Sequence, residues 1–128
     1  MQDNFSHTIK KGTIRGLHYQ KEPYGQAKLF RCIYGAVYDV VVDLRKDSST
    51  CLQWAGFDLN EDRLEWLYVP NGFVHGFQAL CDNCDVQYKV DETYHPGAER
   101  CIRWDDPTLG IDWPISETIL SEMDRDRV

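Results

Sequence analysis

The chain has 128 residues, a length that fits one domain, expected over residues 1–128. Its formal net charge of −7 at pH 7 argues against nucleic acid as a partner, because counterion-release binding needs a broad basic surface. No apolar run approaches the roughly 20 residues that a membrane-spanning helix needs, so no membrane partner is expected.

The most distinct predicted strands are residues 28–34 and 37–45, which are rich in aromatic and β-branched side chains. Gly35-Ala36 lies between them, so the two segments are predicted to pair as a hairpin. Further strands, bounded by turn residues, are predicted at residues 52–59, 65–69, 76–81 and 85–91. Helical periodicity is almost absent, and the one modest helical candidate is residues 116–124.

The predicted fold class is all-β, an antiparallel jelly roll or β-barrel with a short C-terminal helical segment. Many short strands at near-regular spacing favour a closed barrel because closure removes exposed edges, and such a barrel has room for a ligand. Period-two geometry places Asp39 and Asp43 on one face of their strand, beside Val37 and Val41. A polar cavity would explain two carboxylates there. An edge strand with one wet face would explain them nearly as well.

The five cysteines are odd in number and irregularly spaced, which is not the pattern of a secreted disulfide scaffold, so they are interpreted as reduced thiols. Cys81-Asp82-Asn83-Cys84 is a CxxC motif, but no second metal-binding pair accompanies it. A turn with two incidental thiols is therefore favoured over a zinc site. The first residues lack the basic and apolar parts of a secretory signal, so a cytoplasmic setting is expected.

Cationic side chains gather in the first quarter of the chain, whereas acidic ones crowd the last third. A local cluster of cations suits a small anionic ligand, although a solvated basic face would give the same pattern. The cations concerned are Lys10, Lys11, Arg15, Lys28 and Arg31.

The four histidines are isolated from one another, and no two lie one residue apart on a strand, so no metal site is expected. No serine has elbow glycines around it, which argues against a nucleophilic triad. The remaining inventory suits acid/base chemistry next to a carbonyl. His18 alone would more often be a structural residue. His75, however, lies between glycines, where the backbone can come close to a ligand.

Several blocks of sequence occur in the order found in one known family. They are residues 2–4, 12–20, 26–29, 35–45, 70–77 and 104–114. With these blocks the chain resembles the dTDP-4-dehydrorhamnose 3,5-epimerases over essentially its whole length.

The resemblance implies a dimeric, cupin-like jelly roll without metal or other cofactor. Its implied substrate is a nucleotide-diphosphate 4-keto sugar, dTDP-4-dehydro-6-deoxyglucose, and its product dTDP-4-dehydrorhamnose. Matched by motif, the resemblance implies that His18 is the base and that Tyr88 is the acid that reprotonates the opposite face of the sugar. It also implies that Asp124 is the carboxylate paired with the base. Asp39 or Asp43 is the alternative carboxylate on the strand-face argument. The implied substrate contacts are Gln2, Asp3, Asn4, Arg15, Lys28, His75 and Glu99.

The chain departs from the family pattern in ways that keep alternatives open. It begins almost at the Gln-Asp-Asn block, whereas family members usually carry several dozen residues ahead of it, including nucleotide contacts. Met123 stands where a substrate-contacting lysine is common, and Thr93 where a second tyrosine often lies. The alternatives are an epimerase that inverts only C3 or uses another nucleotide, and a truncated, inactive paralogue that only binds.

Overall fold

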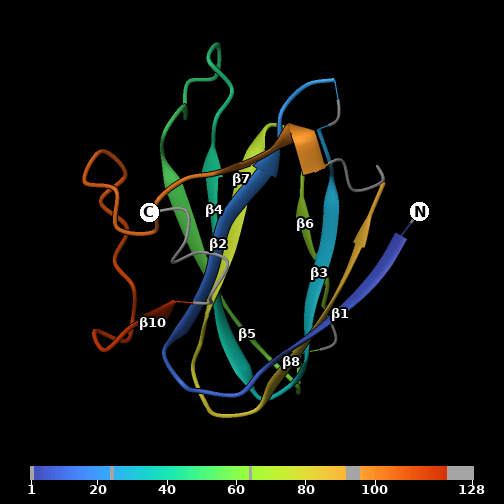
Figure 1. Ribbon diagram of the computed structural model, residues 1–128, viewed down its shortest axis with the longest axis vertical. Helices are drawn as coiled ribbons and strands as arrows, with labels where there is room; N and C mark the ends of the chain where they lie inside the picture. Colours follow the sequence, from blue (N-terminus) through green and yellow to red (C-terminus); the bar gives the residue numbers. More distant parts are fainter. Residues whose placement is uncertain (1, 24, 64, 92–95, 121–128) are drawn as a thin grey trace.

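Two β-sheets face each other in the structure, a computed structural model that describes residues 2–23, 25–63, 65–91 and 96–120 (Figure 1). The predicted all-β class is confirmed. The strands are β1 (Gln2–Thr8), β2 (Thr13–Gln20), β3 (Lys28–Tyr34), β4 (Ala36–Asp43), β5 (Trp54–Asn60), β6 (Leu67–Val69), β7 (Phe73–Ala79), β8 (Cys84–Val90), β9 (Glu99–Cys101) and β10 (Ile119–Leu120). One short 3-10 turn, η1 (Pro96–Ala98), precedes β9.

The first sheet has the strand order β1-β8-β3-β6, and the second has the order β10-β2-β7-β4-β5. The pairing of β10 with β2 is parallel, and the other pairings are antiparallel. One edge of β2 receives two short strands. β10 pairs with the beginning of β2 at Thr13 and Ile14, and β9 pairs with its end at residues 18–20.

The predicted hairpin of residues 28–34 and 37–45 is wrong. Both segments form strands, but β3 pairs with β6 and β8 in the first sheet, while β4 pairs with β5 and β7 in the second. Gly35, with φ of 83°, carries the chain from one sheet to the other. A Cβ there would lie 2.7 Å from Cys81 Sγ and 3.1 Å from Cys84 Sγ, so glycine fits both the conformation and the space. Local sequence predicts the reversal but not which sheet receives the next strand.

The predicted C-terminal helix is also wrong in its described part. Residues 116–118 form no helix, and Ile119 and Leu120 pair with β2 as β10. Tertiary pairing with an open strand edge outweighs the modest helical pattern there. Residues 121–124 of that prediction lie outside the described residues. The strands β1 and β2 were not among the predicted ones.

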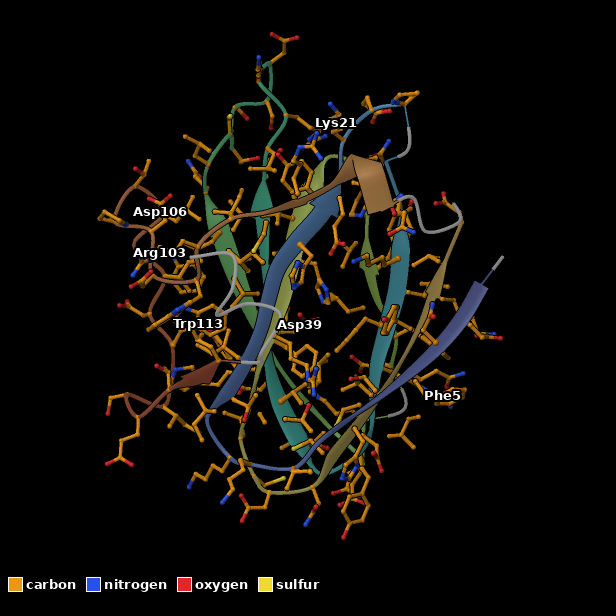
Figure 2. The ribbon with its side chains drawn as sticks, in the orientation of Figure 1. Phe5, Lys21, Asp39, Arg103, Asp106 and Trp113 are labelled. Atoms are coloured by element: carbon orange, nitrogen blue, oxygen red, sulfur yellow. The ribbon has the colours of Figure 1, made fainter. Side chains whose placement is uncertain are left out.

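The predicted faces of β4 are confirmed. Val37 and Asp39 point between the sheets, where Val37 packs in a buried cluster with Phe30 and Phe77. Figure 2 shows Asp39 in this interior. Because β4 lies between β7 and β5, Asp39 is on the inner face of a central strand and not on a wet edge.

The outer face of the second sheet is covered by the segment that follows β9, drawn in orange to red in Figure 1. Leu109 and Trp113 of this segment pack with the β4 side chains Val40 and Val42. Gln78, fully buried on β7, donates to the Ile115 carbonyl oxygen at 3.0 Å and accepts from the Ile115 N–H at 3.1 Å. The cover therefore leaves the inner face of this sheet as the place for a ligand.

A β-bulge in β2 sets which side chains reach that inner face. Arg15 lies opposite Phe77 of β7, and His18 lies opposite His75, so β2 uses three steps where β7 uses two. In a regular strand, residues three apart would point to opposite faces. The extra residue places both Arg15 and His18 on the inner face. Gly16, with φ of 140°, lies in this bulge.

Candidate active site

Seven ionisable side chains from six strands converge on the inner faces of the two sheets. β2, β4, β7 and β9 contribute from the second sheet, and β3 and β8 from the first. Six of them belong to the residues expected from the sequence to form the site, and Asp39 is the seventh. They are Arg15, His18, Lys28, Asp39, His75, Tyr88 and Glu99.

His18 is held between two neighbouring strands. Its Cα is paired with His75 of β7 on one side and with Cys101 of β9 on the other. The Glu99 carboxylate approaches it, with Oε1 3.5 Å from His18 Nδ1. The side chains of His18 and Glu99 are 23% and 11% exposed, so His18 remains reachable while the carboxylate is mostly shielded. A carboxylate beside Nδ1 can hold the imidazole ring in one orientation.

His75 has its own buried carboxylate. Its Nε2 lies 2.6 Å from Oδ1 of Asp39, and both side chains are almost completely buried. The edge of Phe30 packs against the His75 ring, with centroids 4.8 Å apart. Burial raises the pKa of Asp39, while His75 and Lys28 act in the opposite direction. The pair fixes the position of the His75 ring in a dry environment.

This pairing corrects one of the expectations for His18. The strand-face argument offered Asp39 or Asp43 as its carboxylate, but Asp39 contacts His75, and Asp43, the last residue of β4, is held by Arg45 and Thr50. Asp43 accepts from Arg45 Nε at 3.0 Å and from the Thr50 hydroxyl at 2.6 Å. The neighbouring guanidinium holds the pKa of Asp43 well below its usual range. Asp124, the carboxylate implied by the family resemblance, lies outside the described residues.

Lys28, at the beginning of β3, lies within the field of two of these carboxylates. Burial lowers the pKa of Lys28, whereas Asp39 and then Glu99 raise it. Burial dominates because an ammonium group loses most of its hydration inside the sandwich. Lys28 therefore releases its proton more readily than a surface lysine does.

Tyr88 lies on β8 in the opposite sheet from His18. Its ring is stacked on Phe30 at 6.4 Å between centroids, within the same aromatic group as His75. Burial raises the pKa of Tyr88, Arg15 lowers it, and Glu99 raises it. The phenol thus keeps its proton at neutral pH and faces the second sheet from the other wall.

The first strand places the expected Gln-Asp-Asn block beside β8. Asn4 is paired with Tyr88, and Asp3 is paired with Lys89. Oδ1 of Asp3 lies 3.8 Å from Lys89 Nζ, on the outer face of the first sheet. The structure therefore brings Asn4 to the same face as Tyr88 and keeps Asp3 on the other. The side chain of Gln2 lies outside the described part of the chain.

Arg15 is anchored by two acceptors near the end of β1. Its Nε donates to the Thr8 hydroxyl at 2.9 Å, and its Nη2 donates to the His7 carbonyl oxygen at 3.2 Å. This anchoring holds a fixed positive charge at the inner face, close enough to Tyr88 to lower its pKa.

A cavity of about 190 Å³ opens at the end of the sandwich where β3 begins. Lining side chains that the sequence did not single out are Gln20, Gln26 and Asn71, next to His18 and Lys28. Gln20 and Gln26 belong to blocks that carry the family resemblance, which is the signal that could have found them. Asn71 Nδ2 donates to Glu22 Oε1 at 2.8 Å and so ties the loop after β2 to the wall of the cavity.

Within the described ranges, no three histidine, cysteine or carboxylate side chains are grouped so that they could hold a metal ion. No helix in the described part of the chain has the length and apolar character that a membrane span requires.

An antiparallel two-sheet fold with histidine, lysine, tyrosine and carboxylates on its inner walls defines a cupin-like enzyme, and comparison with known proteins specifies the class further. Residues 1–128 match the family described as dTDP-4-dehydrorhamnose 3,5-epimerase. The chain is 48% identical to dTDP-4-dehydrorhamnose 3,5-epimerase of Methanothermobacter thermautotrophicus, over 98% of this chain and 68% of that protein. The chain belongs to this family and is an isomerase.

Solved structures agree with the fold. The crystal structure of dTDP-4-dehydrorhamnose 3,5-epimerase from Bacillus anthracis, with TDP and PPi bound, has a TM-score of 0.94 and 50% identity, covering 98% of this chain and 71% of that one. A 3'-monoepimerase from Streptomyces bikiniensis in complex with dTDP-quinovose has a TM-score of 0.89 and 35% identity, covering 98% and 64%. The cupin-like jelly roll expected from the sequence is thereby confirmed.

Proposed function

We propose that the chain epimerises a dTDP-linked 4-keto-6-deoxy sugar, converting dTDP-4-dehydro-6-deoxyglucose to dTDP-4-dehydrorhamnose. The observation that carries the proposal is the convergence of His18, His75, Lys28 and Tyr88 on facing walls of one barrel. Epimerisation next to a ketone needs a base, a stabiliser for the enolate oxygen, and an acid on the opposite face of the ring. These four side chains supply those roles.

His18 is the proposed base, which removes the proton from the carbon next to the C4 ketone. Its partial exposure leaves it accessible from the cavity, and Glu99 lies 3.5 Å from its Nδ1. A carboxylate there stabilises the imidazolium that forms when the proton is taken. Asp124 is proposed as a second carboxylate for His18 on the strength of the family motif.

Lys28 and His75 are the proposed donors to the enolate oxygen. His75 is fixed before substrate binds by Asp39, whose Oδ1 lies 2.6 Å from its Nε2, and Lys28 lines the cavity next to His18. Donors fixed in a water-poor site stabilise developing negative charge without reorganising.

Tyr88 is the proposed acid. It comes from the first sheet, whereas His18 comes from the second, so a sugar ring between the sheets presents one face to each. Reprotonation from the face opposite to abstraction inverts the carbon. Arg15, Glu99, Asn4 and Gln2 are proposed as substrate contacts, with Arg15 the cation suited to a diphosphate. Asp3 was expected among them, but it lies on the outer face of the first sheet and would not reach a sugar held between the sheets.

The test is exchange in heavy water with dTDP-4-dehydro-6-deoxyglucose, followed by mass spectrometry and NMR. Deuterium at both C3 and C5 is the expected result, with or without a chelator, since the proposed groups are all side chains. Label at neither carbon would mean that the barrel only binds, as a truncated inactive paralogue would.

A C3-only epimerase is the second candidate, favoured by the similarity to the 3'-monoepimerase described above. Both classes share this fold, so the sugar atoms that exchange must decide between them. Deuterium at C3 alone would select this candidate.

A homodimer, a cytoplasmic setting and the choice of dTDP over another nucleotide remain predictions. Sedimentation analysis tests the homodimer, and a comparison of substrates linked to different nucleotides tests the choice of dTDP.

A further inference from the structure

Three cysteines form a thiol cluster at the end of the barrel away from the candidate active site. The cluster consists of Cys32, Cys81 and Cys84. Strand β7 runs from the cavity to the thiol cluster. Its first residue, Phe73, lines the cavity, and Cys81 lies just beyond its last residue. The proposed epimerase chemistry uses none of these thiols.

The turn from β7 to β8 brings two of the sulfurs together. Cys81 Sγ lies 3.2 Å from Cys84 Sγ, and the Cys84 thiol also donates to the Cys81 carbonyl oxygen at 3.1 Å. Asn83 in this turn has φ of 57°, a left-handed conformation that asparagine tolerates. A disulfide bond is about 2.05 Å long, so the two sulfurs need to approach by only roughly 1.2 Å.

Neighbouring backbone holds this turn in place. The Lys11 N–H donates to Asp82 Oδ1 at 2.7 Å, and the Asn83 N–H donates to the Ile9 carbonyl oxygen at 2.9 Å. On the other side, the bare backbone of Gly35 leaves space for both sulfurs, since a Cβ there would lie 2.7 Å from Cys81 Sγ. The contact between the thiols is therefore built into the packing of three loops.

The three thiols differ in access. Cys81 is partly exposed, whereas Cys32 and Cys84 are buried. Burial raises the pKa of Cys32 to about 12 and also raises the pKa of Cys84. An oxidant from solution therefore meets Cys81 first, with the Cys84 sulfur as its nearest thiol.

We propose that Cys81 and Cys84 are a modification site, a dithiol that closes reversibly into a disulfide by exchange with a low-molecular-weight disulfide. The Cys81 thiolate attacks one sulfur of the external disulfide, and the other sulfur leaves as a thiolate that takes up a proton. Cys84 then loses its proton to solvent and attacks Cys81 Sγ, which expels the second external thiol. The protein loses two hydrogens, and one external disulfide becomes two thiols.

Oxidised glutathione tests the proposal on the fully reduced protein. We expect a mass decrease of about 2 Da, reversal by dithiothreitol, and the loss of two of the five titratable thiols. Peptide mapping of the wild-type protein should place the disulfide between Cys81 and Cys84. Because the mapping uses the wild-type protein, its result does not depend on whether a variant at buried Cys84 folds.

Variants separate the roles of the thiols. Cys81→Ser should abolish the mass decrease, while Cys84→Ser should retain one glutathione on Cys81. Cys51→Ser, in the loop after β4, is the matched control and should behave as the wild type does. A lasting glutathione adduct on the wild type, a disulfide between two chains, or a bridge mapped to Cys32, Cys51 or Cys101 would each overturn the proposal.

Discussion

At the scale of single residues, the site depends on two histidines with separate carboxylates. His18 has Glu99 at 3.5 Å and is reachable from the cavity, whereas His75 has Asp39 at 2.6 Å and is buried. We propose that the same residue type serves two tasks here, proton abstraction at His18 and hydrogen-bond donation at His75.

His18→Ala should abolish deuterium exchange at the sugar carbons, a loss of at least about 10²-fold, because it removes the proposed base. The measurement is the rate of label incorporation in heavy water. His7→Ala is the matched control, since His7, on β1, is half-exposed and contacts Asp85 of β8. Exchange at the wild-type rate in His18→Ala would remove His18 from its role.

Tyr88→Phe should slow net epimerisation while leaving part of the exchange, because abstraction can precede donation from the other face. The substitution keeps the ring that stacks on Phe30 and deletes only the hydroxyl. Product formation is compared with label incorporation in the same reaction. Tyr68→Phe, at an exposed tyrosine, serves as control. Full turnover by Tyr88→Phe would mean that another group donates the proton.

Asp39→Asn should lower kcat by about tenfold or more, because His75 loses the charge that fixes its ring. Asp39 also raises the pKa of Lys28, so its removal lets that pKa fall further. The limb of the pH–rate profile that reports Lys28 should then move to lower pH. An unmoved profile with a lower kcat would point to a purely structural effect. Asp58→Asn, exposed on β5, is the control.

At the scale of elements, the close approach of β2 and β7 places the site residues. The bulge between Arg15 and His18 brings both side chains inward, and glycines at positions 16 and 76 let the two backbones meet. The β2–β7 contact is therefore a joint whose spacing the active site depends on.

Gly76→Ala should destabilise the fold by about 1–3 kcal/mol through overpacking. The new Cβ would lie 2.9 Å from the Arg15 carbonyl oxygen and 3.1 Å from Gly16 Cα, neither of which can rotate away. Urea unfolding measures the change. Gly97→Ala is the matched control, because a Cβ there meets no atom of the described residues within 4 Å. Equal stability of the two variants would contradict the account of the joint.

At the scale of the whole molecule, two cores lie on either side of the second sheet. One fills the space between the sheets and includes Cys32, and the other lies under the segment after β9. Burial in the first core raises the pKa of the Cys32 thiol from 9.0 to about 12.

Alkaline stability should report this burial. Between about pH 9 and pH 12 the folded chain retains the Cys32 proton and the unfolded chain loses it, so stability falls as pH rises through this window. Below pH 9 the contribution is fully present. In Cys32→Ala the stability should fall less steeply as the pH rises. The difference in urea unfolding midpoint between wild type and variant, measured under reducing conditions, should therefore narrow with rising pH. Parallel curves would contradict the argument.

Local sequence was sufficient for much of this protein. Strand content, the two faces of β4 and the blocks that carry the family resemblance could be read from the sequence, because propensity and period-two alternation act over a few residues. The family resemblance, and not propensity or alternation, named His18, Lys28, His75, Tyr88 and Glu99, which the structure brings together.

Only the tertiary structure decided which neighbours these residues have. Gly35 leads β4 into the other sheet, the bulge in β2 turns His18 inward, and Asp39 contacts His75 and not His18. The contact between Cys81 and Cys84 likewise depends on the backbone of Gly35. Such contacts are set by sheet pairing and packing between segments far apart in the chain, about which local propensity carries no information.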